Sequence, residues 1–176
     1  MKKILINPGH DVKKDPGAVN KILNLTEAKI VMVIGDMVSA KLAARDYEVC
    51  CLQDNYLTGV ITSANNWQAD IFVSIHCNGF NSSQANGTET LYYSRSAAGK
   101  RLAQCLQDSL VSEFGLTDRG IKSADWAGAL KNTNMPAVIV EMAFLTNDRE
   151  ARLMHEQPAR WADAIVTGIE DYLARR

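Results

Sequence analysis

The stretch "DIFVSIHCN" (residues 70–78) decides the fold class. It holds a near-continuous apolar run, rich in β-branched side chains, and the turn-forming pair Asn78-Gly79 closes it. Such a run is typical of a strand in a mostly parallel sheet, because helices cover both faces of that kind of sheet. "PAVIVEMAF" (136–144) has the same character. The two stretches therefore predict a sheet that is buried on both faces.

Strand and helix patterns alternate along the rest of the chain. Three more short apolar runs are predicted strands: "KILIN" (3–7), "YEVCCLQ" (47–53) and "TETLYY" (88–93). Helical spacing predicts helices at 26–45, 58–68, 96–114, 147–155 and 158–174. Thr26 is the expected cap of the first helix, and Asn147 with Glu150 has the form of a capping box. The pattern predicts an α/β three-layer sandwich, with a mostly parallel sheet of about six strands and helices on both faces.

Length and composition indicate one globular domain, residues 1–176. The chain is 47% hydrophobic and 22% charged, and its formal net charge is −1. A chain this close to neutral has no strong field for nucleic acid or an anionic membrane, so neither is an expected partner. No run approaches the roughly 20 apolar residues that a membrane-spanning helix needs. We therefore expect no membrane insertion.

The N-terminus and the cysteines bear on location and redox chemistry. "MKKILINPGH" lacks the long apolar stretch of a signal peptide, so the chain is expected to be made in the cytoplasm. The four cysteines, at positions 50, 51, 77 and 105, show no C-x-x-C spacing, and no disulfide bond is expected among them. Cys77 should face away from His76, because adjacent strand residues point to opposite faces.

Two of the three histidines follow the same pattern. His10 and His76 each come at the carboxyl end of an apolar run and precede a loop, whereas His155 lies in a charged helical stretch. A single histidine at such a place is most often structural. Carboxyl ends of parallel strands share one edge of the sheet, however, so His10 and His76 are expected to converge there. Pro8 and Gly9 are expected to end the strand and turn the backbone so that His10 projects from this edge.

A metal ion would explain two converging histidines, and it needs a third ligand. The competing carboxylates are Asp11, Asp15, Glu27, Asp70, Glu89 and Glu141. Glu27 stands at the start of a predicted helix, where a favourable interaction with the helix dipole is the structural alternative. Glu141 lies in a buried strand, where a charge is costly unless it is used or paired, for instance with a buried arginine.

Two histidines and one glutamate allow two kinds of metal chemistry. They form a zinc set for hydrolysis, with one position left for water and a second glutamate as general base. They also match the facial triad of non-haem iron oxygenases.

Several motifs, in register along nearly the whole chain, resemble the zinc-dependent N-acetylmuramoyl-L-alanine amidases that trim bacterial cell walls. The motifs are "ILINPGH" (4–10), "DPGAV" (15–19), "LTEAK" (25–29), "ANNWQADIFVSIHCN" (64–78), "NGTETLYY" (86–93), "RGIK" (119–122) and "LKNTNMPAVIVEMAFLTNDRE" (130–150). The resemblance implies that His10, Glu27 and His76 are the ligands of one Zn²⁺ per chain. It implies that Glu141 is the catalytic base.

The resemblance also implies a reaction and a substrate. Family members hydrolyse the amide between the lactyl group of N-acetylmuramic acid and the first L-alanine of the stem peptide, so peptidoglycan (muramyl peptide) is the expected partner. The protein would act on the cell wall after release or export. A catalytically silent wall-binding or regulatory domain of the same fold is the alternative. "NGFNSSQANG" (78–87) is expected to form one wall of the substrate groove.

The chain departs from the family pattern at three positions. Basic residues that the family often carries are replaced at Ala28, around Gln53 and near Val60. None of these is an implied ligand. The departures therefore concern loop packing and substrate contacts more than the metal.

Overall fold

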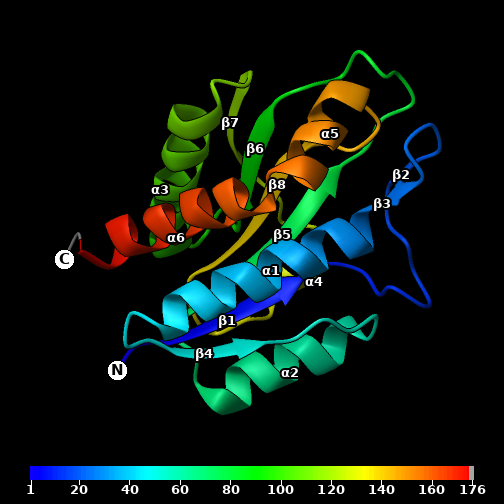
Figure 1. The fold of residues 1–176 in the computed structure, drawn as a ribbon. Coiled ribbons are helices and arrows are strands. Elements are labelled where there is room, and N and C mark those ends of the chain that lie inside the picture. The colour runs from blue at the N-terminus through cyan, green and yellow to red at the C-terminus, as the bar shows by residue number, and fades with distance from the viewer. Residues whose placement is uncertain (175–176) are drawn as a thin grey trace.

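The computed structural model describes residues 1–174, which form a six-stranded sheet with helices on both faces (Figure 1). The strand order is β4-β1-β5-β8-β6-β7. These strands span β1 (Lys3–Pro8), β4 (Glu48–Cys51), β5 (Ile71–Asn78), β6 (Thr88–Tyr92), β7 (Asp118–Ser123) and β8 (Ala137–Phe144). A small antiparallel pair, β2 (Val19–Asn20) with β3 (Leu25–Thr26), precedes the first helix.

The sheet is mixed but mostly parallel, which confirms the predicted class. Strands β4, β1, β5 and β8 run in one direction, while β6 pairs antiparallel with β8 and β7 pairs parallel with β6. Strand β7, which contains the "RGIK" motif, is not among the strands predicted from apolar runs. It is an edge strand whose residues are exposed or half-buried, so its sequence carries no apolar run.

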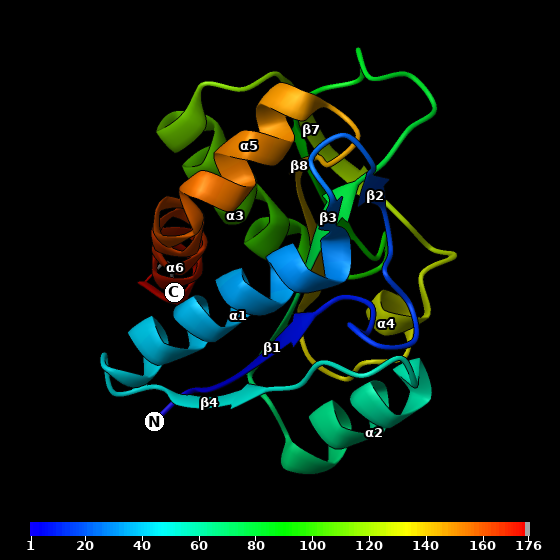
Figure 2. The same cartoon turned by 45° about the vertical axis from the view of Figure 1, so that its right-hand side comes forward.

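The helices are α1 (Glu27–Ala43), α2 (Leu57–Trp67), α3 (Ala97–Phe114), α4 (Gly128–Lys131), α5 (Asp148–Glu156) and α6 (Pro158–Ala174). Their apolar residues divide into two clusters. Helices α1, α3, α5 and α6 cover one face of the sheet, and α2 and α4 cover the other (Figure 2). This arrangement is the expected three-layer sandwich. Within residues 1–174, no helix combines the length and apolar character that crossing a membrane requires.

The larger cluster lies under α1, α3, α5 and α6. Trp161 of α6 is fully buried there and stacks on Phe114, with ring centroids 3.7 Å apart. Cys77 of β5 points into the same cluster, where its sulfur lies 3.6 Å from the sulfur of Met154. The predicted orientation of Cys77 is confirmed, and the described part of the chain contains no disulfide bond.

Of the two predicted helix caps, the one at Asn147 forms, whereas Thr26 makes no capping hydrogen bond. Thr26 occupies the N-cap position of α1, but its side chain makes no capping hydrogen bond. Asn147 does cap α5, accepting from the amides of Arg149 and Glu150. Glu150 does not reach back as a capping box would. It is buried, and its carboxylate accepts from the amides of Gly87 and Phe144 instead, both at 2.8 Å. The Glu150 side chain thereby joins the start of β6 to the end of β8.

Candidate metal centre and active site

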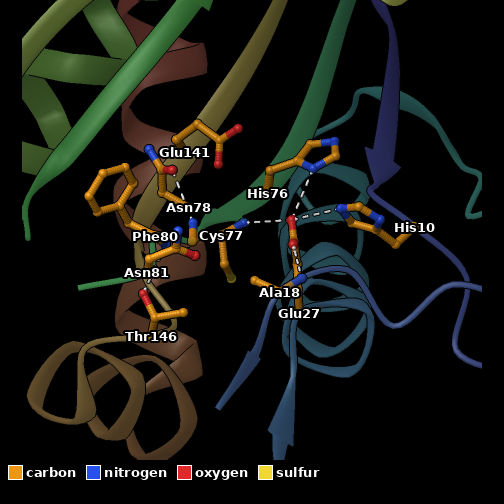
Figure 3. Close-up of a pocket in the computed structure, with 11 residues that line it drawn as sticks. His10, Ala18, Glu27, His76, Cys77, Asn78, Phe80, Asn81, Glu141 and Thr146 are labelled. Carbon is orange, nitrogen blue, oxygen red and sulfur yellow. Dashed lines mark hydrogen bonds and ion pairs between the residues drawn. The ribbon is translucent and has the colours of Figure 1, made fainter. Parts of the chain in front are cut away.

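His10, Glu27 and His76 meet at the carboxyl edge of the parallel strands (Figure 3). His10 follows β1, Glu27 is the first residue of α1, and His76 lies on β5. Glu27 Oε1 is 3.1 Å from His10 Nε2 and 3.0 Å from His76 Nδ1. One potential ligand atom from each residue lies within 4.8 Å of the other two. The convergence predicted for the two histidines and Glu27 is present.

The turn that carries His10 works differently from the prediction. His10 itself adopts the left-handed conformation, with φ of 61°, and Gly9 has no positive φ. Gly9 is required for another reason: a Cβ at this position would lie 2.3 Å from Cε1 of the His76 ring. The glycine therefore makes room for the second histidine. Gly17, with φ of 65°, plays the same part for Glu27, because a Cβ there would lie 2.5 Å from Glu27 Oε2.

Each histidine has a second partner on its outer nitrogen, the ring nitrogen that does not contact Glu27. His10 Nδ1 is 2.8 Å from Asp15 Oδ2, and His76 Nε2 is 3.1 Å from Ser74 Oγ. The Ser74 hydroxyl donates to Asn7 Oδ1 at 2.8 Å, so its oxygen is left to accept from His76. These partners place the ring protons on the outer nitrogens. In a neutral ring of this tautomer, the inner nitrogen, His10 Nε2 or His76 Nδ1, turns its lone pair toward Glu27, as a bound cation requires.

Glu27 is held as a carboxylate. It is only 3% exposed, and its two oxygens accept from the amides of Cys77, at 2.9 Å, and Ala18, at 2.8 Å. Burial by itself would raise the pKa of Glu27, but hydrogen bonds from the two histidines, assisted by the backbone, lower that pKa to about 2. Glu27 is therefore ionised at neutral pH.

The three groups fit a divalent cation. Two imidazole lone pairs and a carboxylate that face one another repel unless a positive charge lies between them. In the metal-free protein a proton supplies that charge: the hydrogen bond to Glu27 is the main cause that raises the pKa of His10 to about 9. Two imidazoles and one carboxylate are a ligand set of catalytic zinc sites, and each ligand here has the outer hydrogen bonds that such sites use for orientation.

Glu141 lies beside this cluster and has no such partners. It is opposite His76 in the register of β5 and β8. Its Oε2 atom is out of contact with solvent and is the one buried side-chain oxygen or nitrogen in residues 1–174 without a hydrogen-bond partner. Burial raises the pKa of Glu141 to about 7, and the charges of Glu27 and Glu89 act in the same direction. None of the arginines in residues 1–174 forms an ion pair with Glu141, so the alternative of an ion pair with a buried arginine is wrong for this part of the chain.

The other competing carboxylates are engaged elsewhere. Glu89 accepts from Arg119, Lys122 and Asn78; burial opposes ionisation, yet the two cations hold the pKa of Glu89 below its usual value. Asp70 pairs with Lys2. Asp11 accepts from backbone amides in its own turn. Asp15 orients His10. Within the described residues, only His10, Glu27 and His76 form a group able to hold a metal.

A cavity of about 470 Å³ opens onto the cluster (Figure 3). Its walls include Glu141, Thr146 and the segment 78–81, in which Phe80 is exposed. Phe80 and Asn81 belong to the loop that the sequence predicted as a groove wall. This part of the loop therefore lies beside Glu141 and the three candidate ligands, and its role as a groove wall stays a prediction.

The three positions that depart from the family pattern are occupied by uncharged residues that pack or form hydrogen bonds. Gln53 donates from Nε2 to the carbonyl oxygens of Gly9 and Ala28, both at 3.0 Å, and so ties the His10 turn to the start of α1. Ala28 is fully buried at the start of α1, and Val60 of α2 is buried in the apolar cluster under α2 and α4. Gln53 therefore supports the site through hydrogen bonds, and none of the three residues brings a positive charge.

Sequence reasoning missed two supporting residues, Asn7 and Ser74. Both are polar and buried in strands, which is a signal that each serves a partner. Ser74 also lies two residues before His76, so the two share one face of β5. Neither the partner nor the direction of its hydrogen bond can be read from that spacing.

Comparisons with known proteins agree over nearly the whole chain. A family model described as N-acetylmuramoyl-L-alanine amidase matches residues 4–171. N-acetylmuramoyl-L-alanine amidase LytC of Bacillus subtilis (strain 168) is 35% identical over 174 residues, covering 96% of this chain and 34% of LytC. The endolysin of Bacillus phage SPP1 is 34% identical over 165 residues, covering 87% of this chain and 58% of the endolysin. The chain thus spans about a third of one relative and somewhat over half of the other.

Solved structures show the same likeness. The catalytic domain of CwlV, an N-acetylmuramoyl-L-alanine amidase from Bacillus (Paenibacillus) polymyxa var. colistinus, superposes with a TM-score of 0.90 at 33% identity. The match covers 100% of both chains.

Proposed function

Because the chain belongs to the N-acetylmuramoyl-L-alanine amidase family, we propose that residues 1–176 are a zinc-dependent catalytic domain that cleaves peptidoglycan. The bond cleaved is the amide between the lactyl group of N-acetylmuramic acid and L-alanine. The observation that carries the proposal is the unpartnered Oε2 of Glu141 beside the His10, Glu27 and His76 cluster. A structural role leaves such an oxygen unexplained, whereas a proton-transfer role requires it.

One zinc ion per chain, held by His10, Glu27 and His76, would supply a Lewis acid for the scissile carbonyl. Asp15 and Ser74 orient the two imidazoles toward that position. The low pKa of Glu27 means that no proton has to leave this ligand before a metal binds.

Glu141 acts as general base and then as general acid. In its ionised form it accepts a proton from the attacking water, whose oxygen forms a bond to the amide carbon. The protonated carboxyl then donates this proton to the alanine nitrogen as the carbon–nitrogen bond breaks. A pKa of about 7 suits both steps near neutral pH.

The expected place of action is the bacterial cell wall, and peptidoglycan is the expected partner. Relatives named as an amidase and as a phage endolysin support this assignment.

Metal analysis together with an activity assay tests the proposal. Protein purified without added metal should contain zinc at about one equivalent per chain, and it should release stem peptides with a free L-alanine amine from purified peptidoglycan. Chelation should abolish release, and zinc should restore it. Iron in place of zinc would favour the oxygenase alternative. Zinc binding without any peptide release would favour the silent wall-binding alternative.

A further inference from the structure

A second cavity adjoins the same two histidines from another side. It measures about 360 Å³, and its lining includes residues of α2 and α4, the two helices that cover the second face of the sheet. His10 and His76 line both cavities, whereas Glu141, Phe80 and Thr146 line only the first. The second is lined by Leu57 at the start of α2, by Ile139 of β8, and by Trp126, Gly128 and Ala129 at α4. His10 and His76 therefore stand between two separate cavities.

Trp126 on the rim of the second cavity is 80% exposed, although its backbone is firmly held. The neighbouring Ala124 and Ala127 are buried, and the Ala124 amide donates to the carbonyl oxygen of Tyr92 at 2.9 Å. Asp125 accepts from the Ser94 amide at 2.9 Å and from its hydroxyl at 2.6 Å. A fixed turn thus presents an indole to solvent. Core packing does not account for Trp126, and a rigid aromatic surface beside a reactive site is suited to ligand binding.

The position of Glu141 decides which half of the substrate enters which cavity. Under the proposed function, Glu141 delivers a proton to the alanine nitrogen, so the peptide leaves from the side that Glu141 lines. That side is the first cavity. The acyl half, which carries the lactyl group and its sugar, must then extend to the opposite side of the metal ligands. The second cavity is the hollow available to it.

We propose that the second cavity is a saccharide subsite, in which the Trp126 indole stacks on an N-acetylated hexosamine ring of the glycan strand. This inference rests on the proposed function for its orientation. The apolar C–H face of a pyranose ring is complementary to an indole face. Leu57 and Ile139 offer apolar contact to an acetamido methyl group, while Asp54 and Asn55 at the rim offer polar atoms to the hydroxyls.

Binding of peptide-free glycan tests this subsite without any catalysis. Chelator-treated protein is titrated by calorimetry with soluble, peptide-free oligomers of alternating N-acetylglucosamine and N-acetylmuramic acid. Trp126→Ala should raise the dissociation constant about three- to tenfold, and Trp126→Phe, which keeps a ring, should raise it less. Tyr56→Ala is the matched control. Tyr56 is also exposed and stands beside the cavity, but it does not line it, so its loss should change binding by less than about twofold.

The kinetic readout separates this subsite from the proposed function. With intact peptidoglycan, Trp126→Ala should raise KM more than it lowers kcat, because stacking contributes mainly to ground-state binding. Equal glycan affinity for wild type and Trp126→Ala would overturn the subsite, as would an equal loss in Tyr56→Ala. Absence of hydrolysis in the wild-type zinc protein would overturn the amidase assignment instead, and the calorimetry would still report on glycan binding.

Discussion

Glu27 and Glu141 are two glutamates near His76, and their surroundings have opposite effects. At the start of α1, two histidines and two backbone amides surround the Glu27 carboxylate and lower its pKa to about 2. On β8, the Oε2 atom of Glu141 has no partner, and burial raises the Glu141 pKa to about 7. Burial opposes ionisation in both cases, so the partners decide the outcome.

The difference assigns the two carboxylates to different tasks. A carboxylate that is ionised at all ordinary pH values suits a permanent positive partner such as a metal ion. A carboxyl group that titrates near neutral pH suits proton transfer. The following experiments test this division of roles between Glu27 and Glu141.

The largest expected effect is on hydrolysis. Glu141→Gln keeps the size of the side chain and removes the base, so peptide release should fall by a factor on the order of 10² to 10⁴ while the zinc content stays the same. Glu156→Gln, an exposed change on α5, is the matched control and should keep wild-type activity. Wild-type turnover in Glu141→Gln would end its assignment as the base.

The complementary change should act on metal binding. Glu27→Ala removes one of three ligands, so zinc affinity should fall by a factor on the order of 10² or more, and added zinc should restore part of the activity. Competition with a fluorescent zinc chelator measures the affinity. If Glu27→Ala bound zinc as tightly as wild type and Glu141→Gln did not, the two assignments would have to be exchanged.

The pKa of Glu141 can be tested through stability in the absence of metal. Because the pKa is raised from 4.5 to about 7 on folding, the folded state binds the proton more tightly, and stability falls as pH rises between these values. Relative to Glu141→Gln, chelated wild-type protein should therefore lose on the order of 3 kcal/mol of unfolding free energy between pH 4 and pH 8. Urea unfolding at both pH values measures it. Parallel pH profiles of the two proteins would contradict the raised pKa.

The smallest expected effect concerns the outer partner of His10. Asp15→Asn leaves all three ligands in place but weakens the group that orients the His10 ring, so zinc affinity should fall by about 10- to 100-fold. Asp11→Asn is the matched control in the same turn. Asp11 accepts only from backbone amides, and its change should alter zinc affinity by less than about threefold. Equal effects of the two changes would mean that the turn, and not the Asp15 carboxylate, holds His10.

Residue types and their order were enough to predict the class of the fold and to indicate four candidate site residues. Apolar runs such as 70–78 fill both faces of the sheet, and that demand is local enough to read from residue types. His10, Glu27, His76 and Glu141 were identifiable because each is a chemically costly residue at a strand end, a helix start or within an apolar strand. The site prediction was therefore strongest where burial and polarity conflict.

The backbone conformation, packing and hydrogen-bond partners of these residues could be seen only in the tertiary structure. The left-handed conformation of His10, the space that Gly9 leaves for His76 and the partners Ser74 and Asn7 all depend on strands that are distant in sequence. Strand β7 was equally hidden, because an exposed edge strand needs no apolar pattern. The antiparallel direction of β6 was hidden as well, because an apolar run does not indicate the direction in which a strand pairs. The solitary Oε2 of Glu141 and the exposed Trp126 are defined by what does not contact them, and local residue patterns do not encode such an environment.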